Sequence, residues 1–145
     1  MSTRDLVLAI DQGTTGSTCL LVDGALQVVA KHNHEFPQHF PQPGWVEHDP
    51  EQLWSSVVRA IADVMAKSGA LAERIAAIGV TNQRETSLLW ERRTGAPIHR
   101  AIVWQDRRTA ARCEQLAAAG HGPRVRELTG LVLDPYFSAT KLAWA

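Results

Sequence analysis

A short polar segment after the first apolar run has the residue types that bind a phosphate group and a metal ion. Its glycines are Gly13 and Gly16, its hydroxyls come from Thr14, Thr15 and Ser17, and Asp11 supplies a carboxylate. Glycine lets the backbone approach a bulky anion, and the N–H groups of a turn suit phosphate. A carboxylate at a strand end can hold Mg²⁺. The segment matches neither common nucleotide-loop pattern, and an ordinary hairpin turn is the alternative explanation.

A second polar segment follows an apolar run in the middle of the chain. Residues 81–86 leave the run 75–80, and in open α/β sheets ligands bind beyond the carboxyl ends of the strands. Arg84 offers a rigid fork of donors and Glu85 offers acceptors, which together match vicinal hydroxyl groups. A solvated ion pair between these two side chains is the alternative.

Aromatic residues near two further turns could complete a polyol site. Trp104 ends an apolar run, and Tyr136 lies in the turn 134–137. An aromatic face can cover the C–H side of a polyol while a phenol hydroxyl binds one of its oxygens. Packing in the core is the alternative for both residues. Core packing is also the role we assign to the other tryptophans, which are Trp45, Trp54, Trp90 and Trp144.

The six histidines show no metal-ligand spacing. His32 and His34 are two residues apart on one expected strand and could share a face, but the sequence shows no third ligand for them. A structural or exposed role is favoured for both.

Short turns, apolar runs and residues typical of helix ends predict the strands and helices that position these residues. Strands at 6–10, 18–22 and 26–36 predict an antiparallel meander. A helix follows, capped by Asp49 and stopped by Gly69. Its expected apolar stripe consists of Leu53, Trp54, Val57, Val58, Ile61, Val64 and Met65. The run 75–80 lacks alternation, which predicts a strand buried on both faces and added in parallel.

The second half of the chain predicts a mixture of strands and helices. Two strands are expected at 87–91 and 101–104, and two helices at about 107–119 and 123–130. A fourth helix begins at Ser138 and has only one or two turns before the last residue. A natural domain seldom stops there, so we expect the domain to be incomplete at its C-terminus.

Composition excludes several classes of function. The 145 residues carry fifteen basic and fifteen acidic side chains, and this balance argues against nucleic-acid binding. No apolar run reaches membrane-spanning length, so we expect no membrane insertion. Cys19 and Cys113 are isolated and no signal peptide precedes the first strand, which favours the cytoplasm.

Five segments in order resemble the N-terminal part of the FGGY family of carbohydrate kinases, and within it the glycerol kinases. The segments are 9–15, 43–50, 78–86, 101–105 and 129–138. The sequences GWVEHDP in the second and NQRE in the third are similar to glycerol kinases rather than to pentulose or gluconate kinases.

The resemblance implies an α/β fold of the ribonuclease-H-like, actin-type ATPase class, with a mixed sheet that starts with the meander and is flanked by helices. Residues 1–145 would form the N-terminal part of the first domain. The implied reaction is transfer of the γ-phosphoryl group of Mg-ATP to glycerol, giving sn-glycerol 3-phosphate and ADP. A kinase of this family for another polyol or ketose and a non-catalytic binding module are the alternatives. The sequence does not decide whether the protein forms a homo-oligomer.

By position in the motifs, the resemblance also implies roles for nine residues. The nucleotide phosphates would lie against Gly13, Thr14, Thr15 and Gly16, and the metal would face Asp11. The glycerol hydroxyls would bind Arg84, Glu85 and Tyr136, and Trp104 would pack on the carbon chain.

Two features depart from the family pattern. Many glycerol kinases carry Arg where this chain has Thr18, which removes one cationic phosphate contact. The family's general-base Asp and its second nucleotide-binding domain lie beyond Ala145, so we expect this chain alone not to turn over glycerol. Asp106 is no substitute, because Arg107 and Arg108 beside it predict a surface ion pair.

Overall fold

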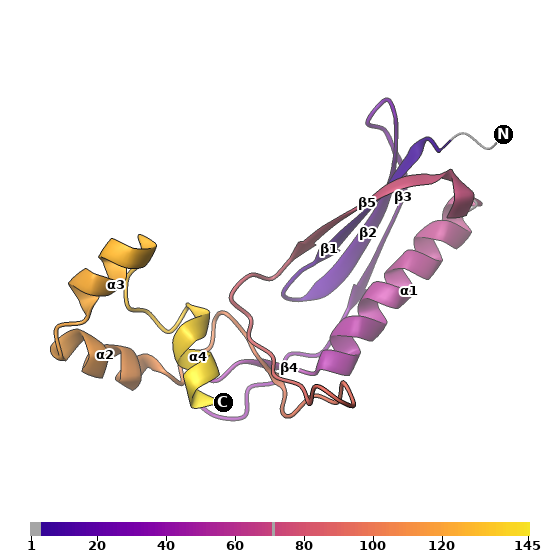
Figure 1. The fold of residues 1–145 in the computed structure, drawn as a ribbon. Helices are drawn as coiled ribbons and strands as arrows, with labels where there is room; N and C mark the ends of the chain where they lie inside the picture. The colour runs from indigo at the N-terminus through magenta and orange to yellow at the C-terminus, as the bar shows by residue number, and fades with distance from the viewer. Residues whose placement is uncertain (1–3, 71) are drawn as a thin grey trace. The chain divides into compact units, whose positions relative to one another are not determined.

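The structure, a computed structural model, describes residues 4–70 and 72–145 (Figure 1). The chain forms two compact units. The first comprises the residues up to Pro37 together with Glu51–Gln83, and the second comprises Gln38–Pro50 and Arg84–Ala145. No helix of the described residues is long and apolar enough to cross a membrane.

A four-stranded sheet forms the first unit, in the order β3-β2-β1-β5. Its strands are β1 (Leu6–Gln12), β2 (Gly16–Asp23), β3 (Val28–Glu35) and β5 (Ile75–Asn82). β1, β2 and β3 pair antiparallel, and β5 pairs parallel with β1. The predicted meander and the parallel addition are therefore both confirmed.

Helix α1 (Pro50–Ser68) packs on one face of this sheet (Figure 1). The core contains alternate residues of the strands and one stripe of the helix: Leu6, Leu8, Cys19, Leu21, Ala30, Ala60 and Val64. The alternation follows from the strand period of two residues, which turns Val7 outward between two buried leucines. A 3₁₀ turn, η1 (Ala72–Arg74), leads from the end of α1 into β5.

Strand β5 is not buried on both faces, contrary to the sequence prediction. It is the edge strand of the sheet, and Ile78 and Val80 are 61% and 70% exposed. Only its first residue, Ile75, packs against the core. Among the described residues no element covers the remaining side chains of β5, so its apolar composition does not translate into burial.

The second unit is built from a two-stranded sheet and three short helices. β4 (Glu47–His48) pairs antiparallel with β6 (Ala101–Ile102). The helices are α2 (Ala110–Ala118), α3 (Gly122–Thr129) and α4 (Ser138–Trp144). The two helices predicted at about 107–119 and 123–130 are present as α2 and α3, and they end before Gly120 and Gly130, whose φ values of 80° and 74° lie in the left-handed region that favours glycine.

The two strands predicted after residue 86 are largely absent. Ser87 and Trp90 form only isolated bridges, with Ile102 and Pro97 respectively, and β6 is two residues long. The carboxylate of Glu91 accepts hydrogen bonds from two backbone N–H groups that follow it. This local turn bends the chain away from a continuous strand.

A buried ion pair holds together segments of the second unit. The Arg108 guanidinium donates to Asp106 at 2.8–2.9 Å and to Glu47 at 2.8 Å. It lies 3.7 Å from the ring centroid of Trp45 and 4.6 Å from that of Trp144. The side chains of Arg108 and Asp106 are 1% and 0% exposed. The pair predicted at the surface is thus buried, because the two indole rings cover the guanidinium.

The tryptophans only partly occupy the core positions assigned to them. Trp45 and Trp144 pack edge to face, with ring centroids 5.3 Å apart. Trp54, Trp90 and Trp144 are 66%, 58% and 48% exposed, so core packing is wrong for these three. Trp54 lies on the outer side of α1 with Val58, because the predicted apolar stripe is wider than the face that contacts the sheet.

Candidate functional site

The turn between β1 and β2 has a backbone that only glycine fits at one position. The Gly13 N–H donates to the Gly16 carbonyl at 2.9 Å. A Cβ atom on Gly16 would lie 2.8 Å from the carbonyl oxygen of His34, and one on Gly13 would lie 3.1 Å from the Gly16 oxygen. Gly16 therefore packs closely against β3, and the lack of space excludes a side chain at this position.

Gln83 ties this turn to the neighbouring parallel strand. Its side-chain amide donates to the Gln12 side chain at 3.2 Å and to the Gly13 carbonyl at 3.3 Å. The pairing of β1 with β5 brings these residues together, since Gln12 lies opposite Asn82. Gln83 is buried, with 8% exposure. Sequence reasoning did not assign it a role, although it lies in the polar segment singled out after β5.

The side chains of the turn present the chemistry expected for phosphate and a hard metal ion. Asp11 is exposed at the carboxyl end of β1, opposite Thr81 of β5. Thr15 is exposed and Thr14 is half-buried. A free carboxylate with hydroxyls and turn N–H groups nearby fits Mg²⁺ and a phosphate, so the residues present are compatible with both.

Two residues that follow the turn make side-chain hydrogen bonds to other parts of the first unit. The Ser17 hydroxyl is buried and lies 2.7 Å from the Ser56 hydroxyl of α1. The sequence suggested that the Ser17 hydroxyl could bind a ligand. Its burial shows that it is not available for this role. The Thr18 hydroxyl donates to the Asn33 side chain on β3 at 3.0 Å.

In the second unit, Trp104 and Tyr136 line one hollow of about 270 Å³. Their rings meet edge to face, with centroids 5.8 Å apart and planes at 67°. The other lining residues are Gln105, Asp106, Arg107 and Asp134. The structure thus joins the two aromatic residues that the sequence placed in one site, next to polar groups able to bind hydroxyls.

Glu85 is held by the start of helix α4 and not by Arg84. Its carboxylate accepts hydrogen bonds from the backbone N–H and the hydroxyl of Ser138, at 2.9 and 2.6 Å. A negative charge at this position also complements the helix dipole. The backbone of Glu85 has a φ of 66°, which an L-residue adopts only when its surroundings impose it. Arg84 is exposed.

Lys141 connects Glu85 to Tyr136 and was missed by sequence reasoning. It is fully buried, and its ammonium group donates to the carbonyl of Tyr136 at 2.5 Å and to that of Glu85 at 3.3 Å. Burial lowers the pKa of Lys141, and the nearby Glu85 carboxylate opposes this shift. A lysine on a short amphipathic helix normally reaches solvent, so no sequence signal marked this one as a positioning residue.

Nearly the whole chain matches one family of known proteins. The family, described as the N-terminal domain of the FGGY family of carbohydrate kinases, matches residues 6–145. The chain belongs to the FGGY family of carbohydrate kinases. The predicted family is therefore confirmed.

Glycerol kinases are among the relatives of this FGGY chain. It is 58% identical to a glycerol kinase of Chelativorans sp. (strain BNC1), over 95% of this chain and 28% of the relative. It is 57% identical to a glycerol kinase of Rhodospirillum centenum, over 99% of this chain and 29% of the relative. The chain thus spans a little over a quarter of the length of these relatives.

Solved structures of FGGY kinases share the fold. Plasmodium falciparum glycerol kinase with ADP matches with a TM-score of 0.84 and 31% identity, over 99% of this chain and 29% of that one. The xylulose kinase of Rhodospirillum rubrum matches with a TM-score of 0.89 and 28% identity, over 96% and 28%. The predicted ribonuclease-H-like, actin-type ATPase fold with a mixed sheet is confirmed.

Proposed function

We propose that the complete protein carrying this chain transfers the γ-phosphoryl group of ATP to glycerol, giving sn-glycerol 3-phosphate and ADP. The observation that carries the proposal is an identity of 56–58% to several glycerol kinases over at least 95% of the chain. The identity to the R. rubrum xylulose kinase is 28%. This difference favours glycerol over a ketose as the acceptor.

The second unit supplies the glycerol-binding residues in this proposal. Trp104 covers the carbon chain, because its ring lines the same hollow as Tyr136. Tyr136, Glu85 and Arg84 bind the hydroxyl groups. Support comes from the fixed backbone around them, since Lys141 holds the carbonyls of Tyr136 and Glu85. Fixed donors and acceptors lower the entropy cost of orienting a small flexible substrate.

The first unit supplies the phosphate-binding turn. Gly13, Thr14, Thr15 and Gly16 lie against the nucleotide phosphates, and the close packing of Gly16 on β3 keeps this backbone rigid. Asp11 would hold Mg²⁺, directly or through water. When bound, Mg²⁺ neutralises charge on the phosphate oxygens.

The reaction itself is an in-line displacement. A glycerol hydroxyl oxygen bonds to the γ-phosphorus, the bond from that phosphorus to the ADP oxygen breaks, and the hydroxyl proton passes to a base. We propose that this base and a second nucleotide-binding domain belong to the polypeptide beyond Ala145, with residues 1–145 forming the N-terminal part of the first domain. The chain by itself is then inactive, because catalysis of phosphoryl transfer depends on complete positioning.

The test is ADP release by the complete gene product with glycerol, D-xylulose and D-gluconate as acceptors. We expect turnover with glycerol, and a loss of at least about 100-fold in kcat/KM for Arg84→Ala. Arg92→Ala is the matched control, because Arg92 is also exposed and belongs to none of the five segments that resemble glycerol kinases. Unchanged turnover in Arg84→Ala would contradict the site assignment. If the protein prefers D-xylulose or D-gluconate, that compound and not glycerol is its phosphoryl acceptor.

A further inference from the structure

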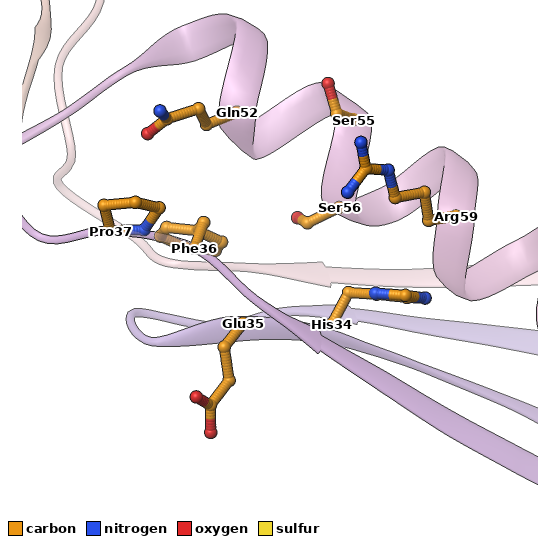
Figure 2. A pocket seen from close by; sticks show the side chains of 8 residues that line it. All are labelled: His34, Glu35, Phe36, Pro37, Gln52, Ser55, Ser56 and Arg59. Carbon is orange, nitrogen blue, oxygen red and sulfur yellow. The ribbon is translucent and has the colours of Figure 1, made fainter.

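Two histidines and one carboxylate converge at the contact between β3 and α1. His32 and His34 project from β3, and Asp63 projects from α1. The Nε2 atoms of His32 and His34 lie 3.4 and 2.6 Å from the Asp63 Oδ2 atom. The two imidazole rings are 4.9 Å apart between centroids. Figure 2 shows His34 between the strand and the helix, with Glu35 turned to the opposite side of β3.

This convergence follows from strand geometry and from the docking of the helix. Residues two apart on a strand share a face, so His32 and His34 both face α1. Asp63 precedes the buried Val64 and stands at the edge of the helix face that contacts the sheet. It supplies the third ligand that the sequence alone did not reveal.

We propose that His32, His34 and Asp63 bind a divalent transition-metal ion, with Zn²⁺ as its representative. Imidazole nitrogen and carboxylate oxygen are the ligand types that Zn²⁺ shares with the neighbouring transition metals. The site differs in chemistry from the oxygen-only environment of Asp11, which suits Mg²⁺. The proposal does not depend on the kinase function.

The distances suit such an ion after small movements of the side chains. Ligand bonds of about 2.0–2.1 Å in tetrahedral geometry place ligand atoms about 3.3 Å apart. The separation of 3.4 Å between His32 and Asp63 already matches this spacing. The 2.6 Å between His34 and Asp63 is a direct hydrogen bond, which must open by roughly 0.7 Å to admit a metal at this spacing. All three ligand atoms lie within 4.8 Å of one another.

Charge and exposure also suit the ion. An aspartate carboxylate carries a negative charge at neutral pH, which attracts a cation. The three side chains are 28–45% exposed. Water can therefore reach the remaining coordination positions, as in metal sites that keep an open position. The bound ion would link strand β3 to helix α1.

The experiment is a calorimetric titration of Zn²⁺ into the complete gene product after treatment with a chelator. We expect saturable binding of Zn²⁺ at this site. His32→Gln, His34→Gln and Asp63→Asn should each weaken Zn²⁺ binding roughly tenfold or more, since even loss of a partner outside the ligand set costs that much. His121→Gln is the matched control, because His121 is exposed and its side chain makes no capping hydrogen bond. It should bind Zn²⁺ as the unaltered protein does.

Three results would overturn the proposal. The first is the absence of saturable Zn²⁺ binding in the unaltered protein, and the second is wild-type affinity in all three variants. Loss of stability in Asp63→Asn with unchanged Zn²⁺ affinity would assign the cluster to a structural ion pair and would also overturn it. Circular dichroism checks folding. His32→Gln is the milder of the two histidine changes, because His32 is 40% exposed and His34 28%, and it keeps the test decisive if another variant unfolds.

Discussion

Replacing Arg108 by Met should destabilise the second unit far more than the same change at an exposed arginine. Arg108 and Arg124 each make an ion pair with an N–O distance of 2.8 Å. The side chains of Arg108 and Asp106 are 1% and 0% exposed, whereas those of Arg124 and Glu127 are 64% and 68% exposed. The charges and the distance are therefore matched, and the two pairs differ in burial and in the additional contacts of Arg108 with Glu47 and the two indole rings.

The expected magnitudes follow from what each substitution leaves behind. Arg108→Met leaves the Asp106 carboxylate buried without its cation, a change that costs about 3–5 kcal/mol. It also removes the guanidinium that packs on Trp45 and Trp144. Arg124→Met leaves only a hydrated carboxylate, so it should cost less than about 1 kcal/mol.

Amide hydrogen exchange on the complete gene product measures this difference locally. The N–H groups of Ile102 and Val103 are suitable reporters, since they donate to Ser87 and Val46 within the same unit. We expect their exchange to accelerate by roughly 100-fold to several thousand-fold in Arg108→Met, as the free-energy loss implies. Adding Asp106→Asn should recover part of the loss, because it removes the unpaired charge.

Two outcomes would refute this reasoning. Equal exchange in Arg108→Met and Arg124→Met would mean that burial of the pair has no energetic effect. A further loss on adding Asp106→Asn to Arg108→Met would mean that the unpaired carboxylate is not the source of the cost.

Two further predictions concern stability. Gly16→Ala should lower the free energy of unfolding by about 1–3 kcal/mol, because the new Cβ would meet the His34 carbonyl oxygen at 2.8 Å. The control Gly24→Ala has open space and should change stability by less than about 1 kcal/mol. Equal urea midpoints for the two variants would contradict the packing argument. The pKa of His48 is lowered to about 4, mainly by burial, so below pH 6.5 the unfolded state binds the extra proton and stability falls towards pH 4. His48→Gln should reduce this acid sensitivity, and an unchanged pH profile of the melting temperature would show that His48 is not its source.

The parts of the fold with local signals were predictable. The meander follows from short turns and strand periodicity, and the helix stops at Gly120 and Gly130 follow from left-handed glycine. Trp104 ends an apolar run and Tyr136 lies in a turn, and both fall in segments that resemble glycerol kinases; these signals placed them in one site, and they do line one hollow.

The parts that depend on tertiary packing were not predictable. Asp63 joins the two histidines only because α1 docks on β3, and no spacing in the sequence encodes that docking. Lys141 is buried by its hydrogen bonds to two carbonyl groups, which override its usual preference for water. Apolar residues can also be exposed, as Trp54 and the side chains of β5 are. Apolar composition predicts burial only where another element covers the residues.

The interleaving of the two units constrains how such a chain could be rearranged in evolution. The polypeptide passes from the first unit to the second after Pro37, returns after Pro50, and passes over again after Gln83. No single recombination point therefore separates them, and an exchange of one unit for a homologous one must replace two stretches at once. The last passage falls between Gln83, which ties down the phosphate turn, and Arg84, which we assign to the polyol. An insertion at this peptide bond would disturb both units together, so we expect natural length variation to avoid it.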